Sequence, residues 1–423
     1  MTTADAAPAP GTIARGRDRA AWWPAAAALL GTGWGANQIT PMLLIYRQTL
    51  GLGTGAVEAV FGVYALGLIP GLLLAGPFSD ARGRRAVVVP AVATSLLASL
   101  LLIAARWGVA PLFAGRLLAG MSSGAVFGAG TAWLRELSRT PLRGASDQSA
   151  ARRAAIAMTT GFALGPLVAG LLAQWAPAPT VVPYLPHVAV MAAALMVLRN
   201  APETVTADGR GPRARRRSAP GLRSPRFRFV VAPMAPWVFA APAVAFALLP
   251  SVVGAGSATD GVALTATITA LCALAGVAIQ PLARRLDGHA GGSRVAATGL
   301  LVLAAGLVIG AATARTGQDW MLVPSAIVLG GAYGLCLVAG LVEVQRIADG
   351  RSLASLTAAY YALAYLGFAA PSLIALGAHL ASYAVLLLIA AAIALGTAAA
   401  ISRAPVPEGA RARGTVSGRR TGS

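Results

Sequence analysis

The chain contains no lysine, and its 34 basic residues, all arginines, are opposed by only 14 acidic residues. Charged residues make up 11% of the sequence. Soluble globular proteins carry roughly 25%, so an ordinary soluble domain is excluded. The hydrophobic fraction is 57% and the mean hydropathy is +0.70. Apolar runs repeatedly reach the ~20 residues that cross a bilayer, and the sequence therefore predicts a polytopic membrane protein.

Residues that carry catalytic or metal chemistry are equally scarce. The two cysteines, Cys272 and Cys336, lie inside apolar runs, which excludes a disulfide framework and a cysteine metal site. There are three histidines, and the sequence has no P-loop, no H-E-x-x-H motif and no nucleophile motif in context. We expect no enzyme, cofactor or metal.

The net charge of +20 is concentrated in loops and tails. The strongest basic run, "RGPRARRRSAPGLRSPRFRF", has no fold context of a nucleic-acid reader and is typical of a cytoplasmic loop facing anionic lipid. Near the N-terminus, the apolar run continues to about Tyr46, too long for a cleavable signal peptide. We interpret it as a retained first transmembrane helix.

Apolar runs between charged and Gly/Pro breaks predict transmembrane helices near 22–46, 56–77, 86–106, 109–133, 154–174, 181–199, 229–250, 261–282, 295–314, 320–344, 353–376 and 380–402. A polar, arginine-rich linker divides them into two sets. The predicted organisation is a tail (1–21), a bundle of six helices (22–200), a basic cytoplasmic linker (201–227), a second such bundle (228–403) and a C-terminal tail (404–423).

The distribution of arginine predicts the orientation. With a cytoplasmic N-terminus, only Arg47, Arg106 and Arg315 lie at outer helix ends and Arg116 lies within a helix, so the remaining 30 of 34 are cytoplasmic. We expect a multi-pass protein of the cell membrane with both termini in the cytoplasm. A monomer in the lipid bilayer is the expected state.

The two sets of helices also repeat each other. Pro77 matches Pro281 at an offset of 204 residues, and "ELSR" from Glu136 matches "EVQR" from Glu343 at 207. "GP" at 165–166 matches "AP" at 370–371 at 205. A period this long indicates duplication of a six-helix unit. The predicted fold class is an all-α membrane protein of twelve helices in two pseudo-symmetric bundles.

One short loop gives this architecture a family resemblance. "GPFSDARGRR" is similar to the G-x-x-x-D-R-x-G-R-R signature of the major facilitator superfamily, with Ala81 where that family usually has arginine and Arg82 one position later. The resemblance implies a cytoplasmic latch between the two bundles. Its expected members, including the E-x-x-R pairs, are Gly76, Asp80, Arg82, Gly83, Arg84, Arg85, Glu136, Arg139, Glu203, Glu343 and Arg346.

Two further motifs resemble those of the drug-exporter branch. "GFALGPLVAG" looks like the antiporter motif, in which Gly161, Gly165 and Gly170 permit close helix approach and Pro166 bends the helix. "APET" resembles the ending of the sixth helix in exporters. The resemblance implies a secondary active transporter that exports a small organic solute in exchange for protons. Uptake by symport, facilitated transport, and a non-transporting sensor or scaffold are the alternatives.

Several residues keep two interpretations. Arg116 is expected either to couple protons or hold substrate, or to be satisfied by backbone carbonyls, because no loop solvates it at that depth. Glu58 is a second coupling candidate, or an interfacial charge. Glu343 is a member of the cytoplasmic charge network or a proton site.

Candidates for the substrate cavity come from helices that line the centre in the resembling family, together with an i, i+4 tyrosine pair. They are Asn37, Gln38, Trp237, Tyr333, Tyr361 and Tyr365. Simple helix packing is the alternative for this aromatic stripe. Because the expected cavity has few charges, it suits amphipathic or weakly polar solutes better than polyanions.

Overall fold

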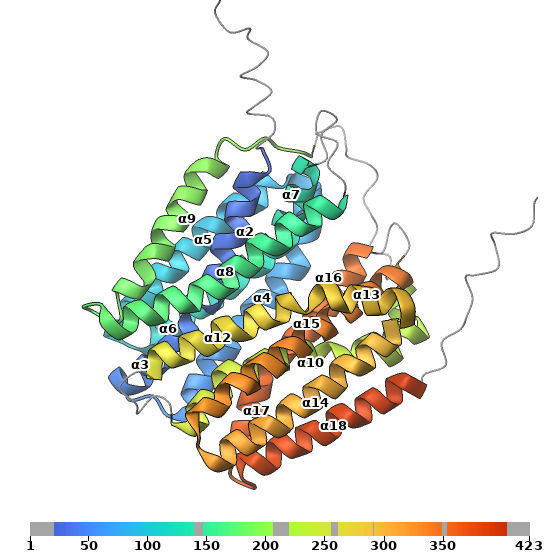
Figure 1. Ribbon diagram of the computed structural model, residues 1–423. Coiled ribbons are helices and arrows are strands. Elements are labelled where there is room, and N and C mark those ends of the chain that lie inside the picture. Colours follow the sequence, from blue (N-terminus) through green and yellow to red (C-terminus); the bar gives the residue numbers. More distant parts are fainter. Residues whose placement is uncertain are drawn as a thin grey trace, which may run out of the picture.

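The computed structural model describes residues 21–138, 147–205, 220–254, 261–290, 292–348 and 353–403, and the regular elements in those ranges are helices (Figure 1). Arg139 therefore lies outside the described residues. The helices of residues 23–198 form one half of the molecule and those of residues 227–403 the other, as Figure 1 shows by the change from blue and green to yellow and red.

The helices of the first half are consistent with six membrane segments. Their helices are α2 (Trp23–Asn37), α3 (Ile39–Thr49), α4 (Thr54–Arg82), α5 (Arg85–Ala104) with the 3-10 turn η1 (Ala105–Trp107), α6 (Val109–Ala125), the π-helical turn η2 (Val126–Gly130), α7 (Thr131–Ser138), α8 (Asp147–Trp175), the 3-10 turn η3 (Val182–Tyr184) and α9 (Leu185–Leu198). The pairs α2–α3 and α6–α7 each make one segment.

The second half repeats this plan with more interruptions. It contains the 3-10 turn η5 (Pro220–Arg223), the π turn η6 (Phe227–Val231), α10 (Ala232–Ala243), the π turn η7 (Val244–Leu248), α11 (Leu249–Val253), α12 (Gly261–Ala278), α13 (Gln280–Ala290), α14 (Gly292–Thr316), η9 (Asp319–Met321), α15 (Leu322–Ile347), α16 (Leu353–Tyr365), η10 (Leu366–Ala369), α17 (Ala370–Gly377) and α18 (Tyr383–Arg403).

The length and apolarity of these helices confirm the predicted fold class. Among the described residues, 10 continuous helices are long and apolar enough to cross a membrane, and Val182–Leu198 is a shorter apolar helix. The remaining segment is α2–α3, which is interrupted at Gln38. Pro41 explains the interruption, because it has no N–H to donate to the carbonyl of Asn37. The arrangement is consistent with twelve segments.

Glycines set the packing inside the first half. A Cβ on Gly161 would lie 2.1 Å from the carbonyl oxygen of Leu30, and one on Gly165 would lie 2.4 Å from that of Trp34, so α8 touches the backbone of α2. Gly120 and Gly124 of α6 approach α4 equally closely, at 2.0 and 2.2 Å from backbone oxygens. The spaced glycines of α8 and α6 are therefore helix contact surfaces.

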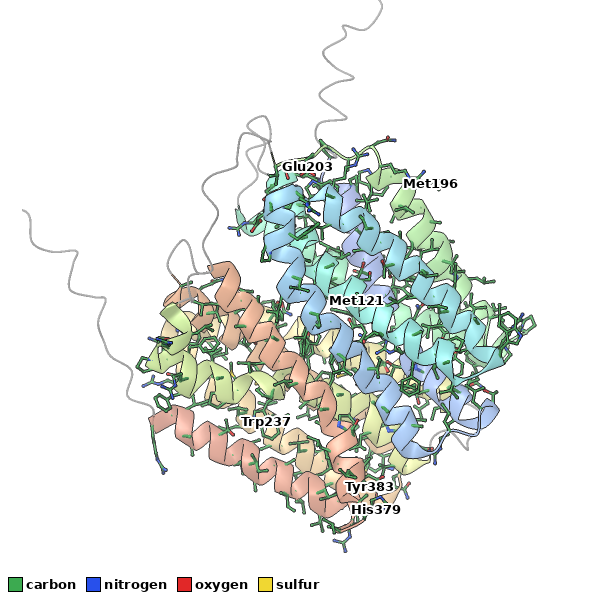
Figure 2. The ribbon with its side chains drawn as sticks, turned by 180° about the vertical axis from the view of Figure 1, so that it is seen from behind. Met121, Met196, Glu203, Trp237, His379 and Tyr383 are labelled. Atoms are coloured by element: carbon green, nitrogen blue, oxygen red, sulfur yellow. The ribbon has the colours of Figure 1, made fainter. Side chains whose placement is uncertain are left out.

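The two ends of the molecule differ, and we name them by one residue each. The Arg84 end holds the α4–α5 loop and the end of α9, and the Arg47 end holds the α3–α4 loop. Figure 2 shows Glu203 at the former and His379 at the latter. Contacts between the halves run from α8 and α3 to α12, and from α4 to α16, η10 and α17.

Candidate functional site

The α4–α5 loop is a tight reversal at Gly83. This residue has φ +104°, a conformation that L side chains rarely adopt, and a Cβ here would lie 2.5 Å from Oε2 of Glu203. Gly76, the first glycine of the signature, has no atom within 4 Å of a built Cβ. Only Gly83 is thus required by the geometry of this conformation.

Arg84 is the centre of the charged groups at this loop. Its side chain is only 12% exposed and pairs with Asp80 at 2.5 Å and with Glu136 at 2.8 Å, and Nη1 also donates to the hydroxyl of Ser79 at 2.6 Å. Nε donates to both oxygens of Glu136 at 3.2 Å. Burial lowers the pKa of Arg84, but these hydrogen bonds and charges outweigh it, and the net pKa lies above its ordinary value.

Glu203 caps the start of α5 from the far end of the first half. Its oxygens accept the backbone N–H groups of Arg84 at 3.0 Å and of Arg85 at 2.9 Å. They also accept those of Thr204 and Val205. Partial burial raises the pKa of the Glu203 carboxyl, yet these four donors together hold it below its ordinary value. A carboxylate at a helix N-terminus also interacts favourably with the helix dipole.

Each residue of the "PET" ending contributes to this site. The carbonyl of Pro202 accepts the indole N–H of Trp133 at 3.0 Å, and the hydroxyl of Thr204 donates to Oε2 of Glu136 at 2.5 Å. Together with Asp80, Arg84, Glu136 and Glu203, they form what we call the first charge cluster. The sequence motif is thus a set of contacts that join the ends of α7 and α9 to the α4–α5 loop.

A second charge cluster occupies the equivalent end of the other half. The carboxylate of Glu343, fully buried near the end of α15, pairs with Arg226 and, at 2.9 Å, with Arg346. The repeat therefore holds for the acid, since Glu136 and Glu343 occupy matching helix ends. The repeat does not hold for the arginine of the loop. Arg84 of the α4–α5 loop pairs with Glu136, whereas Arg226, which pairs with Glu343, comes from the end of the linker. Gln280 also replaces the acid of the first loop. The contacts favour the network interpretation of Glu343.

The ion pairs of the first cluster join residues of the first half, and those of the second cluster join residues of the second half and the linker end that leads into it. Arg82 does not take the contact expected of the missing arginine at 81 and instead stacks its guanidinium over the ring of Phe78, 4.4 Å from the centroid. In this conformation the loop organises its own half, and a latch between the halves stays a prediction about another conformation.

A cavity lies between the halves, and the empty space among its lining atoms, open solvent included, is about 560 Å³. It is lined by Ala36, Asn37, Tyr64, Thr159, Phe162, Phe239, Pro242, Phe246, Ala273, Val277, Tyr333, Tyr365 and Phe368. Seven of these side chains are aromatic and none is charged. We call it the central cavity.

Three of the six expected cavity residues are in this lining, namely Asn37, Tyr333 and Tyr365. Gln38 is not, because one residue further along α2–α3 its side chain turns into the first half and donates to Ser99 at 2.9 Å. Trp237 is not, because Phe239 faces the cavity from α10 and a residue two positions earlier lies on the opposite side of the helix.

Tyr361 is also not in the lining, but its ring lies 6.5 Å from that of Tyr365. The expected i, i+4 pair is thus present with one member facing the cavity. Tyr365 stacks on Phe239 with a centroid distance of 4.3 Å and an interplanar angle of 16°, and Phe368 stacks on both rings, at 5.2 Å from Phe239 and 5.6 Å from Tyr365. Phe61 and Tyr64 of the first half meet Phe368 edge to face.

Arg116 lies one layer behind this wall. It is 1% exposed, its Nη1 donates to the carbonyl of Ala36 at 3.1 Å, and its guanidinium lies over the ring of Tyr64 at 4.5 Å from the centroid. A longer bond of 3.4 Å runs to the carbonyl of Val60. These contacts agree with the alternative in which backbone carbonyls satisfy Arg116. Two of the contacting residues, Ala36 and Tyr64, also line the central cavity. The side chain of Glu58, the other coupling candidate, is not among those described.

The halves are in direct contact on the Arg47 side of the cavity. A Cβ on Gly170 of α8 would lie 2.2 Å from that of Ala266 of α12, and Gln174 accepts the N–H of Ala263 at 3.3 Å. A second space of about 390 Å³, the outer cavity, lies here between Thr40, Arg47, Val57, Pro250 and Ser251. Phe246 lines both cavities and is the side chain between them.

The described residues contain no group of three or more histidine, cysteine, aspartate or glutamate side chains that could hold a metal ion. The motifs, the helix count and the repeat all indicate a transporter fold.

Two solved structures share the fold. A variant of the nucleoside transporter NupG superposes with a TM-score of 0.71 at 14% identity, covering 90% of this chain and 98% of that one. A variant of the peptide transporter POT superposes with a TM-score of 0.72 at 13% identity, covering 90% and 93%. A search of curated proteins finds no significant sequence match.

The family model described as Major Facilitator Superfamily matches residues 25–371, from the first membrane segment to the eleventh. The match includes the α4–α5 loop, both charge clusters and all residues that line the central cavity. The chain belongs to the Major Facilitator Superfamily, and it is a transporter and not an enzyme.

Proposed function

We propose that this transporter carries a small organic solute through the central cavity by alternating access, and that it exports the solute in exchange for protons. The observation that supports the proposal best is the cavity itself, which is lined by residues of both halves at mid-depth. A site shared by two halves changes its exposure when they rock against each other. Residues 22–200 and 228–403 are the two moving bodies of this proposal.

The distribution of arginine supports placing the Arg84 end, with both termini, in the cytoplasm of the cell, and the protein in the cell membrane as a monomer. In that orientation the contacts of Gly170 and Gln174 close the outer side. The first charge cluster then lies at the cytoplasmic end, where the loop of the family signature latches the halves in the outward-open state. Export and proton exchange rest on the "GFALGPLVAG" and "PET" motifs.

Purified protein in vesicles tests the proposal. An imposed pH gradient and an internal pH dye report proton movement when a panel of aromatic solutes is added. Exchange predicts that a transported solute and protons move in opposite directions, whereas uptake by symport moves them together. Vesicles prepared without the protein are the control. A panel that produces neither solute movement nor proton movement would favour the sensor or scaffold alternative.

A further inference from the structure

We propose that the central cavity selects planar aromatic substrates that carry a negative charge and discriminates against cations of the same shape. The inference rests on the proposed role of this cavity in transport. The argument starts from the guanidinium of Arg116, which stays protonated at any physiological pH.

The charge of Arg116 is not neutralised by a carboxylate among the described side chains. Its contacts are the carbonyls of Ala36 and Val60 and the ring of Tyr64. The acidic residues of the membrane-spanning ranges are Glu58, Asp80, Glu136, Asp319 and Glu343. Three of them belong to the charge clusters, Asp319 begins η9 at the Arg47 end, and Glu58 is near the start of α4.

The position of Arg116 directs this charge at the substrate. Ala36 and Tyr64, which hold the guanidinium, are themselves part of the cavity wall. A unit charge about 10 Å away, at an effective dielectric constant of about 20, changes a binding constant roughly tenfold. A negative substrate gains that factor and a positive one loses it.

The aromatic wall would otherwise favour cations, because ring faces attract them. In this cavity one face of Tyr64 is already occupied by Arg116. The other rings pair mostly with one another, as in the stack of Tyr365, Phe239 and Phe368. They are suited to stacking on a planar ring, while Asn37 and Thr159 offer hydrogen bonds from the first half.

The outer cavity, on the same route between the halves, is also associated with a positive charge. Among the residues that line the outer cavity, the charged one is Arg47. Both spaces between the halves are therefore associated with an arginine, and no acid is among the described side chains that line them. An anion moving between them meets attraction at each end of its path.

Three probes of nearly equal shape test the proposal: 2-naphthoate, 2-naphthamide and 2-naphthamidine, which are an anion, a neutral compound and a cation. Binding to the full chain in lipid nanodiscs is measured by calorimetry, without transport. We expect naphthoate to bind at least tenfold tighter than naphthamidine, with the amide between them. Naphthoate that does not bind, or that binds no tighter than the amidine, overturns the proposal.

Variants locate the effect. Arg116→Met should weaken naphthoate about tenfold and strengthen naphthamidine about tenfold, so that their ratio falls about a hundredfold, and it should leave the affinity for the amide nearly unchanged. Arg106→Gln, at an exposed arginine stacked on Trp107 at the Arg47 end, removes the same charge from the surface and should leave the ratio as it is. If Arg116→Met does not fold, the binding of the three probes to the unmodified chain still tests the charge preference.

Tyr365→Leu removes a stacking ring of the lining without changing charge, and should weaken all three probes by a similar factor. Unchanged binding in that variant would place the probes outside the cavity and overturn the proposal. Charge preference without transport would contradict only the proposed function, and transport without charge preference would contradict only this inference.

Discussion

The carboxylate of Glu203 accepts the backbone N–H of Arg84 at 3.0 Å, across 119 positions of the sequence. This bond joins the last membrane segment of the first half to the loop between its second and third segments. It explains why the "PET" ending and the loop signature occur in one chain: the ending supplies the cap that the loop requires.

Glu203→Gln tests the cap. The pKa of Glu203 in the folded protein lies below its ordinary value of 4.5, so its contribution to stability is complete above that pH and is lost as the pH falls through the lower, folded pKa. We expect a loss of about 1 kcal/mol at pH 7, the usual value of a helix cap. Thermal unfolding against pH should show the variant and the wild type converging below about pH 4.5. Glu408→Gln, in the C-terminal tail, is the control, and a pH-independent difference would contradict the prediction.

Gly83→Ala should destabilise the protein by about 1–3 kcal/mol, the cost of a side chain in a disfavoured backbone conformation. The added Cβ also meets Glu203, so the cap is displaced as well. Gly76→Ala is the matched control, because its Cβ enters open space. Chemical unfolding of both variants in detergent measures the difference, and equal stabilities would refute the role of Gly83.

Asp80→Asn should slow transport severalfold while the protein still inserts and folds. Its carboxylate is 63% exposed and Arg84 keeps Glu136, so little stability depends on it in this conformation. If the loop latches the halves in the outward-open state, the substitution removes the acid of that latch and should slow transport. Initial rates in vesicles, normalised to the amount of inserted protein, measure the effect, and wild-type rates would exclude a latch role for Asp80.

Gly170→Leu should open the outer side of the molecule. The side chain cannot fit against Ala266, so the contact between α8 and α12 is lost. A cysteine introduced at Thr40, which is buried in the outer cavity, should then react several times faster with a membrane-impermeant maleimide. The native Cys272 and Cys336 are buried, so the background is low. Gly396→Leu, where a Cβ meets open space on α18, should leave the rate unchanged.

The sequence was sufficient to predict the segments and the small residues, for physical reasons. Length and apolarity determine membrane segments, and Gly161 and Gly165 stand out because only glycine allows two backbones to touch. Glu203 and Glu136 could be found because an acid is rare in so apolar a chain.

The cavity was harder to predict. Gln38 differs from Asn37 by one position, which turns a side chain about 100° around a helix. Tyr64, Phe162, Phe239, Phe246 and Phe368 were missed, because an aromatic residue in a uniformly apolar helix gives no sign of which face it occupies. Arg226 was missed as the partner of Glu343 because only the folded chain brings the linker end to α15.

The confinement of each charge cluster to one half makes the halves separable units. The described members of the first cluster end at Thr204, and those of the second begin at Arg226. A break introduced within residues 206–219 would remove no described member of either cluster. Two fragments produced from separate genes should therefore fold with their own ion pairs and reassemble through the apolar surfaces of α8 and α12. The duplication seen in the sequence would then be recovered as two associating proteins.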